Sequence, residues 1–128
     1  MATIASRKIL LIGIDPSLID FGNSTSGRTP ESINAARDKI QEELDALGFE
    51  VHHCIVDLGA TAVAQVKEVL ENDKFDSIMI GGAVRALPQH TILFEEIINL
   101  IHQKAPASRI CFNTGPETTV AAILRSIG

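Results

Sequence analysis

Four short apolar runs, each followed by an amphipathic segment, constrain the fold of this 128-residue chain more than any other feature. The first run, residues 8–15, is continuously hydrophobic until it ends at Asp15 and Pro16. A strand without polar alternation is covered on both faces, which is typical of parallel sheets. We therefore expect this strand at the centre of a sheet that has helices on both sides.

The rest of the chain continues the same alternation. Thr29 and Pro30 supply an N-cap and a first-turn proline, and Gly48 follows the end of the helix that they open. Further strands are expected at residues 49–56, 75–82 and 108–113, with helices from Thr61, at 89–104 and from Pro116. Strict β/α alternation requires right-handed crossovers onto a parallel sheet. The sequence predicts an α/β fold, a three-layer α/β/α sandwich of flavodoxin-like or Rossmann-like type, with four mainly parallel strands ordered 2-1-3-4.

Length and hydropathy indicate one domain that spans residues 1–128. A chain of this size closes a single hydrophobic core without disulfides or metals. The longest apolar stretch near the start, residues 9–14, is far shorter than the roughly 20 residues of a membrane-spanning helix. It also lacks the small-residue cleavage site of a signal peptide. We therefore expect a cytosolic (cytoplasmic) protein that has no membrane segment.

Charge and residue types exclude several classes of partner. The net charge is −5 and the basic residues are scattered, which argues against nucleic-acid binding. Cys54 and Cys111 form no C-x-x-C pair, so we expect two buried thiols. His52 and His53 point to opposite faces of one strand and do not chelate a metal together. With no Trp, no Tyr and five Phe, few rings can stack on a flavin or a base. We expect neither a metal nor a cofactor.

The predicted strand order places a ligand site at one edge of the sheet. The order reverses direction between the first and third strands, and ligands of open α/β sheets bind beside such a point, at the carboxyl ends of the strands. The long loop of residues 16–29 follows the first strand there. The polar and glycine residues expected at this edge are Asp15, Ser17, Asp20, Gly81, Gly82, Arg85, Asn113, Thr114 and Glu117.

These residue types favour the binding of an anion. The two glycines let the backbone approach a ligand, and Arg85 offers a planar fork of donors to a phosphate or carboxylate. We therefore predict a small anionic ligand bound by Asp15, Ser17, Gly81, Gly82, Arg85, Asn113 and Thr114. In the alternative interpretation the glycines only form a tight turn and Arg85 pairs with a neighbouring acid such as Asp15.

The motifs do not decide whether the protein is an enzyme. The chain lacks the G-x-x-x-x-G-K-[ST] and G-x-G-x-x-G phosphate-binding patterns and the G-x-S-x-G nucleophile elbow. Ser24, Gly27 and Thr29 have the spacing of the flavodoxin phosphate loop, but about eight residues separate that loop from its strand. Asp15 and His90 are the candidate catalytic residues. A triad with Ser17 would need an arrangement that the sequence does not specify.

A second function class competes with ligand binding. Glu95, Asn99 and His102 follow one another at helical spacing along one side of the helix expected at residues 89–104. A four-stranded sheet has few ways to hide its edges, and a twofold-symmetric dimer is the commonest solution. The alternative prediction is therefore a non-catalytic, homo-oligomeric protein-interaction module that uses this helix to form a homodimer.

Four segments together resemble a group of small uncharacterised bacterial α/β proteins. They are residues 15–21 (DPSLIDF), 80–85 (IGGAVR), 94–102 (FEEIINLIH) and 111–114 (CFNT). The likeness spans nearly the whole chain. It implies a compact, stand-alone cytosolic protein of bacterial type, and it carries no known activity, so no catalytic role transfers from it.

Overall fold

A parallel four-stranded sheet lies at the centre of the computed structural model, which describes residues 7–18, 29–57, 61–85 and 87–127. The strands are β1 (Lys8–Ile14), β2 (Glu50–Val56), β3 (Ser77–Ile80) and β4 (Arg109–Phe112). Their order is β2-β1-β3-β4, and every pairing is parallel. The predicted strand order is thus confirmed, and the sheet is parallel throughout.

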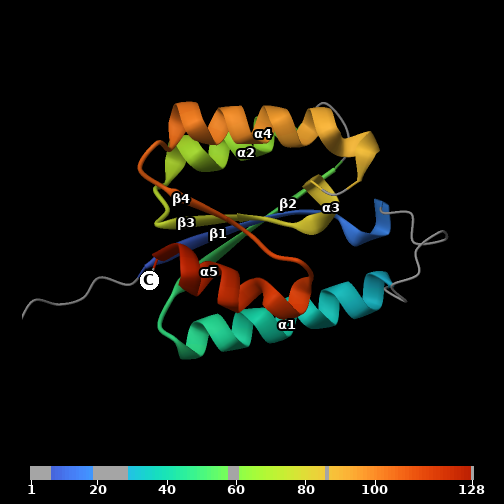
Figure 1. The fold of residues 1–128 in the computed structure, drawn as a ribbon, viewed down its shortest axis with the longest axis vertical. Coiled ribbons are helices and arrows are strands. Elements are labelled where there is room, and N and C mark those ends of the chain that lie inside the picture. Colours follow the sequence, from blue (N-terminus) through green and yellow to red (C-terminus); the bar gives the residue numbers. More distant parts are fainter. Residues whose placement is uncertain (1–6, 19–28, 58–60, 86, 128) are drawn as a thin grey trace, which may run out of the picture.

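Helices cover both faces of the sheet. In Figure 1, α1 (Pro30–Ala46) and α5 (Thr119–Ile127) lie on one side, and α2 (Thr61–Asn72) and α4 (Thr91–Lys104) on the other. A four-residue helix, α3 (Gly82–Arg85), follows β3, and single 3-10 turns lie at Pro16–Leu18, Pro88–His90 and Pro116–Thr118. The predicted three-layer α/β fold is confirmed. No helix in the described part of the chain is both long and apolar enough to span a membrane.

Burial of β1 explains its central position. Its side chains alternate between two hydrophobic clusters, because successive residues of a strand point to opposite faces. Leu10, Ile12 and Ile14 pack in the cluster that includes α2 and α4. Ile9 and Leu11 pack in the cluster that includes residues of α1 and α5. One uninterrupted apolar run therefore supplies both halves of the core.

The start of α1 follows from its first residues. The Thr29 hydroxyl accepts a hydrogen bond from the Ser32 backbone N–H at 3.1 Å. The Ser32 hydroxyl in turn lies 2.8 Å from the Thr29 backbone N–H and accepts from it. This reciprocal capping box satisfies two donors that a helix start otherwise leaves without partners. It fixes the beginning of α1 at the position that the sequence predicted.

The outer strand β4 is less protected than the others. Of its four residues only Cys111 is buried, and the other three are exposed. Cys54 of β2 is buried too, and both cysteines are free thiols. Burial raises the pKa of the Cys54 thiol.

Candidate functional site

Two adjacent glycines end β3 and have different surroundings. The Gly81 N–H donates to the Ile12 carbonyl at 2.9 Å and so continues the pairing between β1 and β3. A Cβ on Gly81 would lie 3.3 Å from that carbonyl oxygen, a tight contact, so the close approach of the two strands favours glycine. A Cβ on Gly82 would meet nothing within 4 Å. Among the described residues, a small side chain at Gly82 would therefore meet no steric obstacle.

Arg85 ends α3 and turns toward β4. Its Nε donates to the Ile80 carbonyl at 3.4 Å, and its Nη2 donates to Asn113 Oδ1 at 3.3 Å. The guanidinium carbon lies 5.4 Å from the centre of the Phe112 ring. That ring stands edge-on to Phe94, with 6.1 Å between the ring centres. An aromatic face and two oxygen acceptors thus orient the guanidinium.

The Arg85 guanidinium keeps most of its donor capacity. It has five N–H donors, and the bonds to Ile80 and Asn113 use two of them. Both distances are long for N–H···O bonds, so these contacts orient the group and leave it weakly satisfied. Arg85 makes no ion pair with any acid in the described ranges, Asp15 included. The alternative in which Arg85 pairs with Asp15 is therefore not what the structure shows.

Asn113 and Thr114 form hydrogen bonds with other residues of the protein. Asn113 is 7% exposed, and its Nδ2 donates to Thr119 Oγ1 at 2.8 Å while its Oδ1 accepts from Arg85. The Thr114 N–H donates to Thr118 Oγ1 at 2.9 Å, and the two hydroxyls lie 3.1 Å apart. These bonds fix the connection between β4 and α5. Asn113 is thus a positioning residue for Arg85.

Asp15 and Ser17 form a separate pair at the end of β1. Asp15 Oδ1 accepts from the Ser17 N–H at 3.0 Å and from the Ser17 hydroxyl at 2.8 Å. The two hydrogen bonds, with a smaller contribution from the charge of Arg37, hold the pKa of Asp15 below its usual value. Asp15 is therefore a fixed carboxylate at neutral pH. Its negative charge opposes an anion placed next to it.

His90 lies in another environment. It is 7% exposed, and its Nδ1 lies 2.6 Å from the Ala83 carbonyl oxygen, to which a protonated Nδ1 donates. This bond joins the start of α3 to the turn before α4. Within the described residues neither Asp15 nor Ser17 is hydrogen-bonded to His90, so the structure does not assemble the triad.

The structure thus gathers part of the predicted site. Arg85 and Asn113 meet at the carboxyl ends of β3 and β4, and Gly82 begins the helix that carries Arg85. Phe112 joins them, although sequence reasoning did not select it; its place directly before Asn113 was the available signal. Asp20 and the loop of residues 19–28 lie outside the described residues. Glu117 lines a groove of about 380 Å³ between α1 and the start of α5, on the helical face.

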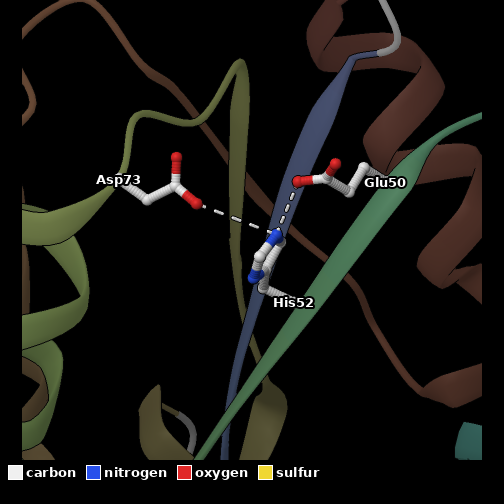
Figure 2. A group of neighbouring side chains, drawn as sticks. All are labelled: Glu50, His52 and Asp73. Carbon is white, nitrogen blue, oxygen red and sulfur yellow. Dashed lines mark hydrogen bonds and ion pairs between the residues drawn. The ribbon is translucent and has the colours of Figure 1, made fainter.

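A second polar group lies at the opposite, amino-terminal edge of the sheet (Figure 2). His52 Nε2 is 2.8 Å from Glu50 Oε2 and 3.9 Å from Asp73 Oδ2. Lys8 Nζ lies 2.7 Å from Asp73 Oδ1 and 3.4 Å from Glu50 Oε2. Hydrogen bonds from His52 and Lys8 lower the pKa of Glu50, and those from Lys8 and from the Lys74 backbone lower that of Asp73.

Sequence reasoning named His52 but not its partners. Glu50 and His52 are two residues apart in β2, so period-2 alternation already places both on one face. Asp73 comes from the connection between α2 and β3, and no local spacing reveals its approach. Asp73 could therefore be assigned to this group only from the three-dimensional structure.

Comparison with known proteins adds no assignment: no protein-family model matches the chain, and no curated protein matches it significantly. The resemblance to small bacterial α/β proteins stays a prediction.

The two glycines provide a test of this geometry. We expect Gly81→Ala to lower the free energy of unfolding by about 1–3 kcal/mol, because the added methyl group meets the Ile12 carbonyl inside the sheet. Gly82→Ala, the matched control, should leave stability unchanged or raise it by up to about 1 kcal/mol. Urea denaturation followed by circular dichroism measures both values. Equal stability of the two variants would contradict this placement of Gly81.

Proposed function

We propose that this protein binds a small anionic ligand, through a phosphate or carboxylate group, at the carboxyl ends of β3 and β4. One observation carries the proposal: the partly buried Arg85 guanidinium is oriented by its neighbours and has no acidic partner in the described chain. A guanidinium binds carboxylates and phosphates through parallel N–H bonds, and charge-assisted bonds of this kind are stronger than neutral ones.

The surroundings of Arg85 support an anion as the ligand. The guanidinium carbon of Arg85 lies over the Phe112 ring, so a ligand approaches the guanidinium from the sides that face away from that ring. Gly82 leaves open space at the start of the same helix. The fixed carboxylate of Asp15 disfavours an anion at the end of β1 and directs it toward β4. The residues that we propose to contact the ligand are thus Arg85 and Gly82, and Asn113 and Phe112 position the Arg85 side chain.

The proposal covers binding and assigns no reaction. Asp15 is held as a carboxylate by Ser17, and His90 is engaged with a backbone carbonyl. We place this binding function in the cytosol. Two free, buried thiols support that location, because cytosolic proteins keep their cysteines reduced.

A homodimer is the second candidate, and the exposure of β4 favours it. Ile110 and Phe112 are 36% and 40% exposed, and within the described residues no strand pairs with the outer side of β4. An open edge with apolar side chains is a template for pairing with another strand. We propose that a second copy pairs along β4, which moves the expected interface from the Glu95, Asn99 and His102 face of α4 to the sheet edge.

Ligand binding is tested by thermal unfolding with inorganic phosphate and with a dicarboxylate such as succinate. A ligand that binds only the native state stabilises it by about 2.7 kcal/mol at 100 times its Kd, which raises Tm by several degrees. We expect Arg85→Ala to abolish this shift. The matched control, Arg109→Ala, removes an exposed guanidinium from β4 and should keep it. A shift that survives in Arg85→Ala, or is lost equally in both variants, would reject the site.

The dimer is tested by size-exclusion chromatography with light scattering. We expect the native chain to run as a dimer and Ile110→Lys as a monomer, because a buried, unpaired ammonium at the β4 edge opposes association. Ile92→Lys is the matched control, since Ile92 is 63% exposed on α4 and lies outside the β4 edge. A native monomer at high concentration would rule out the dimer.

A further inference from the structure

Three potential metal ligands meet at the amino-terminal edge of the sheet, away from the proposed anion site. Glu50 and His52 come from one face of β2, and Asp73 comes from the loop after α2 (Figure 2). One imidazole nitrogen and two carboxylate oxygens, one from each residue, lie within 4.8 Å of one another. Each of the three side chains is at least partly accessible to solvent. An ion from solution can therefore reach them.

The two distances from His52 to the carboxylates fit a shared ion. First-row divalent ions lie about 2.0–2.2 Å from nitrogen and oxygen ligands, so two ligands of one ion are at most about 4.3 Å apart. His52 Nε2 lies 2.8 Å from Glu50 Oε2 and 3.9 Å from Asp73 Oδ2. The longer gap is too wide for a hydrogen bond and falls inside the limit for two ligands of one ion. A small rotation of the exposed Glu50 side chain would bring its carboxylate oxygen to the distance from Asp73 Oδ2 that one shared ion requires.

One neighbour orders the imidazole of this group. The edge of the Phe75 ring approaches His52, with 5.4 Å between ring centres and planes at 75°, which limits rotation of the imidazole. Ordering of ligands by outer neighbours of this kind is a regular feature of metal sites.

We propose that Glu50, His52 and Asp73 form a binding site for a divalent transition-metal ion, with Zn²⁺ as the reference ion. A set of one imidazole and two carboxylates suits zinc and its first-row neighbours better than Mg²⁺, which prefers oxygen ligands alone. The ion binds the neutral imidazole through the unprotonated Nε2, and the one proton of the ring is then carried by Nδ1. Three protein ligands leave one or more positions for water.

Lys8 acts as a competitor in this site. Its ammonium lies 3.4 Å from Glu50 Oε2, the oxygen nearest to His52, so an ion that binds there meets a positive charge. Replacing Lys8 by methionine keeps the aliphatic stem and removes that charge. The expected effect is about 30-fold tighter binding, the size of the repulsion between a divalent ion and one positive charge at about 4 Å in water.

The test is isothermal titration calorimetry of the full chain with ZnCl₂, together with the visible absorption of the protein loaded with Co²⁺. We expect a stoichiometry of one ion per chain and a Co²⁺ spectrum that changes when the ligands change. His52→Ala should weaken Zn²⁺ binding more than about 100-fold. The matched control is His53→Ala, because the side chain of His53 points to the other face of β2 and contacts Gln41 instead.

The variants separate a specific site from general binding to histidines. Circular dichroism without metal establishes that each variant is folded. Loss of binding in His52→Ala, retention in His53→Ala and tighter binding in Lys8→Met support the site. Equal binding by the two histidine variants, or an unchanged Co²⁺ spectrum in His52→Ala, would overturn it.

Discussion

Burial of β1 on both faces is the constraint on which the rest of the structure depends. Leu10 and Ile12 face one helical layer and Ile9 faces the other, so neighbouring strands must flank β1 and helices must cover both sides. Parallel pairing to β2 and β3 then brings all carboxyl ends to one edge and all amino ends to the opposite edge. The group around Arg85 and the group around His52 lie at these two edges, separated by the length of the sheet.

Regular patterns made most of the fold predictable from the sequence. Continuous apolar runs and helix caps act locally, so the strands and the principal helices followed from them, whereas the strand order was assumed from the flavodoxin-like arrangement and is confirmed by the structure. The predicted first residues of α4 and α5 were less accurate. Pro88 and Pro116 open single 3-10 turns, and the helices begin only at Thr91 and Thr119. A proline marks where a helical segment can start, but the tertiary context sets its hydrogen-bonding pattern.

The candidate site was only partly predictable because side-chain direction depends on contacts between strands. Sequence order placed Asp15 and Arg85 at the same edge, yet Asp15 bonds to Ser17 two residues away and Arg85 turns toward Phe112 and Asn113. The Asp15–Ser17 hydrogen bond joins residues two positions apart, so it could have been predicted from the sequence. The cation–π contact of Arg85 with Phe112 joins residues 27 positions apart, and the approach of Asp73 to His52 joins residues 21 apart; both required the assembled sheet.

The central claim is that the Arg85 guanidinium is oriented, has no acidic partner among the described residues and accepts an anion. The most direct measurement follows the Nε–H signals of the arginines by ¹H–¹⁵N NMR while inorganic phosphate is added at constant ionic strength. A saturable shift of the Arg85 signal, with those of Arg109 and Arg125 unchanged, is the predicted result. If the Arg85 signal stayed still, or if all arginine signals moved together, the claim would be contradicted.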